Sequence, residues 1–130
     1  MKHVPFIAAM ILLAGVAFAA GDIPTKTMLL DKTVTGDDTK HGVTLMVYWP
    51  VGSVVPDHTH PGDEYAFVLE GTIEVTTKGQ GTKVYKAGEA YFNAKDVVHS
   101  ARAVGDVPAK TIATIVAEKG KPLSEPVKQK

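Results

Sequence analysis

The sequence of 130 residues contains no cysteine, so neither a disulfide nor a cysteine-linked lipid anchor is available to it. It has a single arginine, Arg102, and its acidic and basic residues balance at 14 each. The scarcity of arginine argues against bidentate capture of phosphates or carboxylates as a dominant theme. The balanced charge offers no basic surface for a polyanion. We therefore predict no nucleic-acid partner.

A long apolar run is found at the N-terminus and nowhere else. It extends from Phe6 to Phe18, follows Lys2 and His3, and ends in small residues at Ala19. This pattern predicts a secretory signal peptide over residues 1–19; an uncleaved membrane anchor is the alternative, although the run is short of about 20 apolar residues. No arginine pair is present, which favours export of the unfolded chain. We expect a periplasmic or secreted protein without a stable membrane anchor.

The remaining sequence lacks a sustained helical periodicity and instead shows short alternating segments separated by turn residues. This organisation predicts an all-β fold, a single antiparallel β-barrel or jelly roll. Residues 20–41 are expected to form an extended segment, and residues 119–130, with Pro122, Pro126 and four lysines, a flexible tail. The predicted strands are Lys26–Val34, Val43–Trp49, Val54–His60, Glu64–Leu69, Thr72–Thr77, Thr82–Lys86, Ala90–Phe92, Val97–Val104 and Lys110–Ala117.

Two histidines and a carboxylate surround a Pro-Gly-Asp turn. His58 and His60 are two positions apart, so they project from the same face of an extended segment. Glu64 opens the next predicted strand, and a short hairpin can return it beside the histidines. Imidazole and carboxylate are ligands for a divalent transition metal, but such an ion needs at least one more. His99, in a separate predicted strand, is the remaining candidate.

These residues and their flanking glycines resemble the two sequence motifs of the cupin superfamily. The first motif matches at every spacing, and in the second the spacing from Gly88 to His99 is kept. Ala94, Asp96 and Ala103 stand where proline, glycine and asparagine are usual, which puts the loop geometry near residues 94–96 in question. The resemblance implies a small barrel over residues 42–118 that holds one divalent metal. The first-motif positions are Gly52, His58, His60, Glu64 and Gly71, and the implied metal ligands are His58, His60, Glu64 and His99.

The ligand set does not select among copper, zinc, iron, manganese and nickel, although metal loading outside the cytoplasm favours copper or zinc.

Strand alternation predicts a small apolar wall around the ion: Ala66 and Val68 share the face of Glu64, and Val54 that of the histidines. Val97, Ala101 and Ala103 share the face of His99, Pro56 that of the histidines, and Arg102 points outward. No inward basic residue or proton carrier is predicted, so neither oxalate-type decarboxylation nor sugar isomerisation is supported.

The resemblance leaves three functions open. The first is a metal-dependent small-molecule enzyme of oxygenase type, whose catalytic residues the sequence does not identify. The second is a module that binds a metal or metal–ligand complex without turnover, and the third is a metal-stabilised structural barrel. Tyr48 and Tyr91 are the candidates for contacting a small-molecule ligand. Cupins often form pairs, so a homodimer through residues 22–35 is expected.

Overall fold

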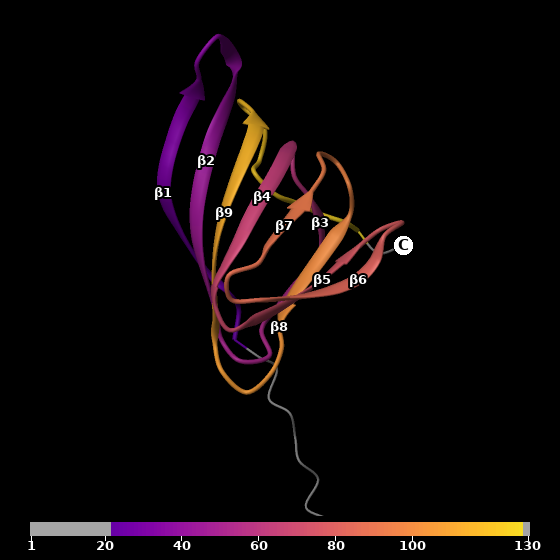
Figure 1. Cartoon of the computed structure of the whole chain (residues 1–130). Helices are drawn as coiled ribbons and strands as arrows, with labels where there is room; N and C mark the ends of the chain where they lie inside the picture. The colour runs from indigo at the N-terminus through magenta and orange to yellow at the C-terminus, as the bar shows by residue number, and fades with distance from the viewer. Residues whose placement is uncertain (1–21, 129–130) are drawn as a thin grey trace, which may run out of the picture.

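In a computed structural model that describes residues 22–128, the chain forms two five-stranded antiparallel sheets (Figure 1). The first sheet has the strand order β1-β2-β9-β4-β7 and the second β10-β3-β8-β5-β6. No helix occurs in the described residues, which confirms the predicted all-β fold. The strands are β1 Thr25–Val34, β2 Asp37–Trp49, β3 Val54–Thr59, β4 Gly62–Glu70, β5 Thr72–Thr77, β6 Gly81–Lys86, β7 Ala90–Asn93, β8 His99–Ala103, β9 Ala109–Glu118 and β10 Glu125–Pro126.

The core lies between the two sheets and is made by alternate residues of their strands. In β9 every second residue from Ala109 to Ala117 is buried, and the residues between are half-buried. Val43, Val68 and Ile73 are at most 1% exposed, and each contributes about 1.5–3 kcal/mol by leaving water. The two-residue repeat seen in the sequence therefore describes how each strand divides its side chains between core and exterior.

The glycines of the two sequence motifs lie at turns that need a backbone conformation favourable to glycine. Gly52, Gly71 and Gly88 all have positive φ angles, a conformation that residues with a side chain rarely adopt. At Gly71 a Cβ atom would also lie 2.5 Å from the carbonyl oxygen of Pro108. Asp96 has φ 61° and is the one non-glycine residue of the described chain in this region. Aspartate tolerates this conformation, so the turn forms although the usual glycine is absent.

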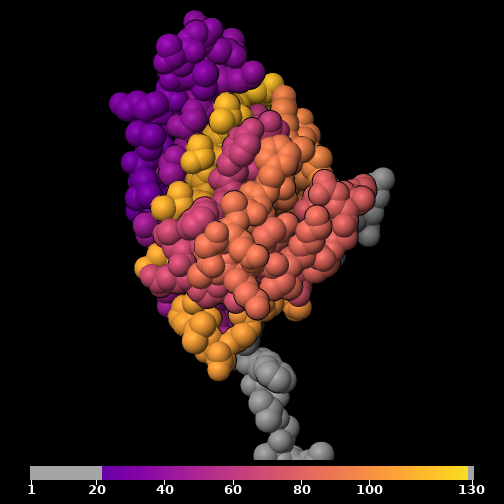
Figure 2. All heavy atoms as spheres, in the orientation of Figure 1, coloured from indigo at the N-terminus to yellow at the C-terminus, as the bar shows by residue number. Residues whose placement is uncertain are grey.

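The predicted N-terminal extended segment is one arm of a long hairpin. β1 pairs with β2 from Thr25 to Val34, and β2 pairs with β9 only from Lys40 onward. The tip of the hairpin therefore extends beyond the barrel, as its indigo atoms show at the top of Figure 2. The predicted signal peptide, residues 1–19, lies outside the described residues. Within residues 22–128 no helix has the length and apolar character needed to cross a membrane.

The segment expected to be a flexible tail instead packs against the barrel. Glu125 and Pro126 form β10 and pair with Thr59 and His58 of β3. The amide of Val127 donates a hydrogen bond to the carbonyl of Asp57. Leu123 is half-buried and packs on the core cluster. A composition poor in apolar residues suggested the tail, but a few backbone hydrogen bonds and one leucine hold residues 123–127 in place.

Candidate metal centre

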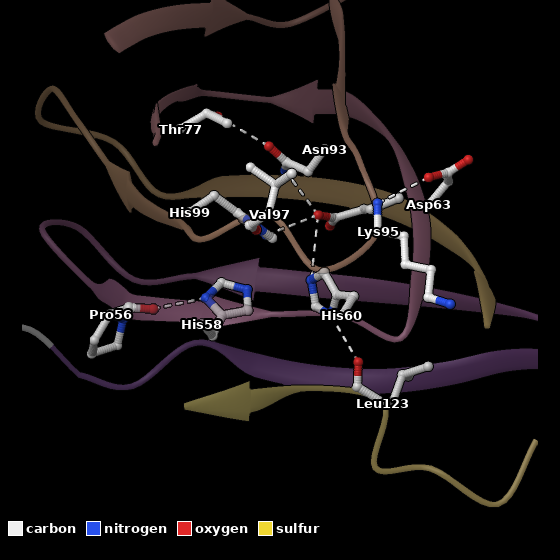
Figure 3. A network of polar contacts seen from close by, with 11 residues as sticks. Pro56, His58, His60, Asp63, Thr77, Asn93, Lys95, Val97, His99 and Leu123 are labelled. Atoms are coloured by element: carbon white, nitrogen blue, oxygen red, sulfur yellow. Dashed lines mark hydrogen bonds and ion pairs between the residues drawn. The ribbon is translucent and has the colours of Figure 1, made fainter. Parts of the chain in front are cut away.

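Three imidazole rings converge inside the barrel (Figure 3). His58 lies in β3, His60 directly follows this strand, and His99 begins β8, which pairs with β3. The ring centroids are 4.8 Å apart for His58 and His60, 4.2 Å for His58 and His99, and 5.0 Å for His60 and His99. One nitrogen of each ring lies within 4.8 Å of the other two. A single ion can contact all three.

Each of these rings is held from behind by a backbone carbonyl. The Nδ1 atom of His58 is 2.7 Å from the carbonyl oxygen of Pro56, and that of His99 is 2.9 Å from the carbonyl oxygen of Val97. The Nδ1 atom of His60 is 2.7 Å from the carbonyl oxygen of Leu123 in the C-terminal segment. Because a carbonyl only accepts, Nδ1 carries the proton and Nε2 presents its lone pair inward. This is the arrangement of metal-binding histidines.

Glu64 completes the cluster from β4, in the other sheet. Its Oε2 atom lies 3.4 Å from Nε2 of His60 and 3.3 Å from Nε2 of His99. The side-chain amide of Asn93 donates a 2.9 Å hydrogen bond to the same oxygen. The hydroxyl of Thr77 in turn donates to Oδ1 of Asn93 at 3.2 Å. This chain fixes the orientation of the carboxylate, as outer hydrogen bonds commonly do for metal ligands.

The environment favours the protonation states that a metal requires at two of the ligands, His58 and Glu64. Burial lowers the pKa of His58 to about 4, with a further contribution from the neighbouring rings, so this imidazole is neutral near pH 7. Burial acts to raise the pKa of Glu64, but the contacts with His60 and His99 and the hydrogen bond from Asn93 outweigh it and the pKa is lowered. Burial opposes charge on His99, yet its contact with Glu64 raises the pKa of this ring. An ionised Glu64 beside the neutral ring of His58 is part of a donor set for a divalent ion.

One atom of the cluster shows directly that the site fits a metal. Nε2 of His99 is buried and has no hydrogen-bond partner. A buried polar atom without a partner costs about 1–3 kcal/mol. A divalent transition metal among the rings would satisfy this lone pair and those of the other two histidines. His58, His60, Glu64 and His99 therefore fit the metal ligands that the sequence motifs imply.

A cavity of about 40 Å³ adjoins these residues. Apart from the ligands, the polar groups in its lining are Lys26, Tyr91, Asn93 and Thr111, and Trp49 donates a 3.0 Å hydrogen bond from Nε1 to Oγ1 of Thr111. Burial, followed by the charge of Glu64, raises the pKa of Tyr91, so its phenol keeps its proton. The apolar lining residues are Leu45, Val47, Trp49, Val55, Ala101, Ala113 and Ile115.

The predicted wall is correct in part: its β4 and β8 residues are buried, but only Ala101 of them lines the cavity, and Val54 and Pro56 of β3 are exposed. Ala66, Val68, Ala101 and Ala103 are buried on the inner faces, and Arg102 points outward, where it pairs with Glu74. Val54, expected to face the metal, is 48% exposed, and Val55 lines the cavity in its place. The reason is a β-bulge: Val55 pairs with Ala101 and His58 with His99, so β3 has one residue more than β8 over this stretch.

Of the two tyrosines predicted to contact a ligand, one lines the cavity and the other does not. Tyr91 is 8% exposed and lines the cavity, but Tyr48 is 45% exposed and does not. In β2 the buried residues are Val47 and Trp49, so Tyr48 points to the outer side. Asn93 was missed, although its position two residues after Tyr91 in one strand would have placed it on the inner face.

The predicted absence of an inward basic residue is wrong. Lys26, which also went unrecognised in the sequence, lines the cavity from β1. It pairs with Val47 across the β1–β2 ladder, and Val47 is an inner-face residue. The sequence did not reveal this pairing, because it joins two strands whose relative register is decided by the hairpin.

Comparison with known proteins gives one family and several similar folds. The sequence pattern of the family described as "Cupin domain" matches residues 44–115, more than half of the chain. A germin-like protein, subfamily 2 member 1, from Arabidopsis thaliana is 38% identical over 78 residues, which cover 55% of this chain. The match spans only 36% of that relative.

Two solved structures show the likeness of the fold. A conserved protein with a double-stranded β-helix domain from Klebsiella pneumoniae superimposes with a TM-score of 0.68 at 17% identity, covering 85% of this chain and 90% of that one. The DMSP lyase DddQ from Ruegeria pomeroyi gives a TM-score of 0.66 at 22% identity, covering 81% of this chain and 52% of that one. At these identities the structural similarity establishes the architecture alone.

Proposed function

The chain belongs to the cupin domain family, and on this basis we propose that it is an exported, metal-dependent enzyme of oxygenase type acting on a small molecule. The ion would be held by His58, His60, Glu64 and His99. When bound, it would supply Lewis-acid or redox chemistry at the end of the cavity.

The observation that carries this proposal is the inward direction of three imidazole Nε2 atoms. Each ring gives its Nδ1 proton to a backbone carbonyl, and one inward Nε2, that of His99, has no other partner. A barrel that needed these histidines only for packing would not leave a buried acceptor unsatisfied. The arrangement is preorganised for a metal.

The other lining residues have supporting roles in this proposal. Asn93 orients the carboxylate of Glu64, and the apolar wall keeps water from the far side of the cavity. Tyr91 keeps its proton, so it can donate a hydrogen bond to a ligand but does not act as a base near neutral pH. A substrate that supplies its own acidity is therefore favoured.

We propose copper or zinc as the resident metal, of which only copper is redox-active and would support oxygenase chemistry, with iron, manganese and nickel compatible with the same ligands. Export of an unfolded chain would place metal loading outside the cytoplasm, where the intrinsic affinity order favours copper and zinc. Elemental analysis of protein purified from its native compartment tests this. Stoichiometric iron or manganese would contradict it.

Oxygen uptake tests the enzymatic proposal. Metal-loaded protein is incubated aerobically with catechols, flavonols and thiols, and dissolved oxygen is followed with an electrode. We expect uptake with at least one compound, abolished by His99→Ala. Metal binding without uptake for any of them would instead support the second candidate, a cupin that binds a metal or metal–ligand complex without turnover. The cavity of about 40 Å³ favours this alternative, since it has room for about three water molecules.

We also propose a periplasmic or secreted location and a homodimer. The location rests on the predicted signal peptide, and the mass of the mature protein checks it: loss of residues 1–19 is expected. The homodimer rests on β1, an edge strand whose residues Met28, Leu29 and Leu30 are 48–59% exposed. Pairing with a second copy would cover this edge. Light scattering that gives the monomer mass would contradict it.

A further inference from the structure

The C-terminal residues 123–127 form a strap along the strand that carries two of the candidate ligands. Within the strap, β10 occupies the edge position of the second sheet and pairs with β3 at Thr59 and His58. The amide of Val127 donates a 3.0 Å hydrogen bond to the carbonyl of Asp57. The strap therefore lies directly against the backbone of the metal site, on the outer edge of the sheet.

One residue of the strap also contacts a candidate ligand. The carbonyl oxygen of Leu123 lies 2.7 Å from Nδ1 of His60, while Nε2 of the same ring faces Oε2 of Glu64 (Figure 3). The side chain of Leu123 packs on the core cluster, and with the strap in place His60 is 6% exposed. Separation of the strap would remove the acceptor and open the ring to water in a single step.

The strap is attached by much less than the barrel strands are. β10 has two residues, both exposed, and one of them is a proline, which has no amide hydrogen to donate. By contrast, β2 pairs with β9 at every residue from Lys40 to Trp49. Gly120, just before the strap, has φ 77° and open space around it, so the chain can bend there. Segments with few contacts and exposed hydrogen bonds open locally while the rest of a protein stays folded.

We propose that the strap gates metal exchange: it separates from β3 to let the ion enter or leave, and it closes to hold His60 on the ion. In the closed state Leu123 fixes the ring. In the open state the ring is free to turn away, and loss of an outer hydrogen bond of this kind typically weakens metal binding about 10- to 100-fold. The ion therefore leaves mainly through the open state. This proposal rests on the proposed metal site.

A reversible disulfide across the strap tests the proposal. Thr59 and Glu125 are directly opposite in the ladder, where Cα atoms lie about 4.5–5.5 Å apart, a separation that a disulfide can span. Thr59 is half-buried between the buried His58 and His60, so its side chain points away from the ligands. The chain has no cysteine of its own, so Thr59→Cys combined with Glu125→Cys can form only this bond.

Zinc release into an excess of chromogenic chelator is timed for the zinc-loaded variant, once oxidised and once reduced. We expect release from the oxidised form to be at least about tenfold slower than from the reduced form, which should behave like the wild type. Zinc content and circular dichroism are recorded for both forms beforehand.

The matched control is a disulfide in the same sheet, away from the strap. Thr76 and Thr82 are an exposed, directly opposite pair of β5 and β6, and their hydroxyl oxygens are 2.8 Å apart. Thr76→Cys combined with Thr82→Cys should release zinc at the same rate in both redox forms.

Equal release rates in the oxidised and reduced strap variant would overturn the gate and leave the metal site standing. Slowing of the same size by the control disulfide would also overturn the gate, because a stiffer barrel would then account for the effect. A wild type that retains no zinc would overturn both the gate and the metal site.

Discussion

The carbonyl oxygen of Leu123 is the acceptor that orients His60, and removing it should weaken metal binding. The 2.7 Å hydrogen bond from His60 Nδ1 is the contact that joins this ring to the C-terminal segment. A chain that ends at Lys121 would lose this acceptor and also the pairing of β10 with β3. His60 is 6% exposed with this segment in place, so truncation would remove the acceptor and also open this side of the ring to water. The ring would then be free to rotate or to change tautomer.

The magnitude follows from two independent estimates. A donor that stays buried without a partner costs about 1–3 kcal/mol, which is the upper limit here because water can reach the ring once the segment is gone. Loss of an outer hydrogen bond to a metal-binding histidine typically lowers metal affinity about 10- to 100-fold. The two agree, because tenfold in affinity corresponds to about 1.4 kcal/mol. We therefore expect the shortened chain to bind zinc about 10- to 100-fold more weakly than the full chain.

Competition with a chromogenic chelator measures this affinity, and circular dichroism verifies that the β-fold is retained. Two variants separate the hydrogen bond from other effects. A chain that ends at Val127 keeps Leu123, β10 and the Val127 amide, so it should bind zinc normally. Leu123→Ala keeps the carbonyl and loses only the packing of a half-buried side chain, so it should reduce stability more than zinc affinity. Unchanged zinc affinity in a folded chain ending at Lys121 would refute the reasoning.

Three further predictions concern the ligands, their support and the backbone. His58→Ala and His99→Ala should each remove most of the bound metal while circular dichroism still reports a β-fold. The control His41→Ala lies outside the cavity lining and should change neither the metal content nor the circular dichroism spectrum. Full metal content in both site variants would disprove the ligand assignment. Asn93→Ala removes the amide that orients the carboxylate of Glu64, so it should lower zinc affinity about tenfold in the same chelator assay. An unchanged zinc affinity would show that this hydrogen bond does not position the ligand. Gly62→Ala places a Cβ atom on the carbonyl oxygen of Val116 in β9, so it should lower the melting temperature by several degrees, which corresponds to at least about 1 kcal/mol. An unchanged melting temperature would mean that β4 and β9 can move apart without cost, which would contradict this prediction.

Much of the fold could be predicted because the strands show their own alternation and most turns contain a glycine. Thr72–Thr77 was predicted with its observed bounds, and most other strands differ by one or two residues at an end. β2 is longer, because its first residues pair only with β1 in the hairpin. Local preferences of this kind are expressed within a few residues, and for that reason they can be recognised from the sequence.

The residues that surround the metal ligands depend on contacts between distant segments. Val55 replaces Val54 in the cavity because of a bulge defined by the pairing of β3 with β8. Lys26 lines the cavity because β1 pairs with β2 in one particular register. Leu123 supports His60 across 63 positions of the sequence. None of these relations leaves a local pattern that could be recognised in advance.

The sequence by itself determined the all-β fold class, the turns and the four candidate ligands, since these depend on residue type and on short spacings. Only the tertiary structure decided that the three rings and the carboxylate meet, what holds each of them, and which other side chains share their cavity. The physical reason is that register and bulges are set by hydrogen bonds between strands far apart in the chain, and a shift of one residue exchanges the inner and outer faces.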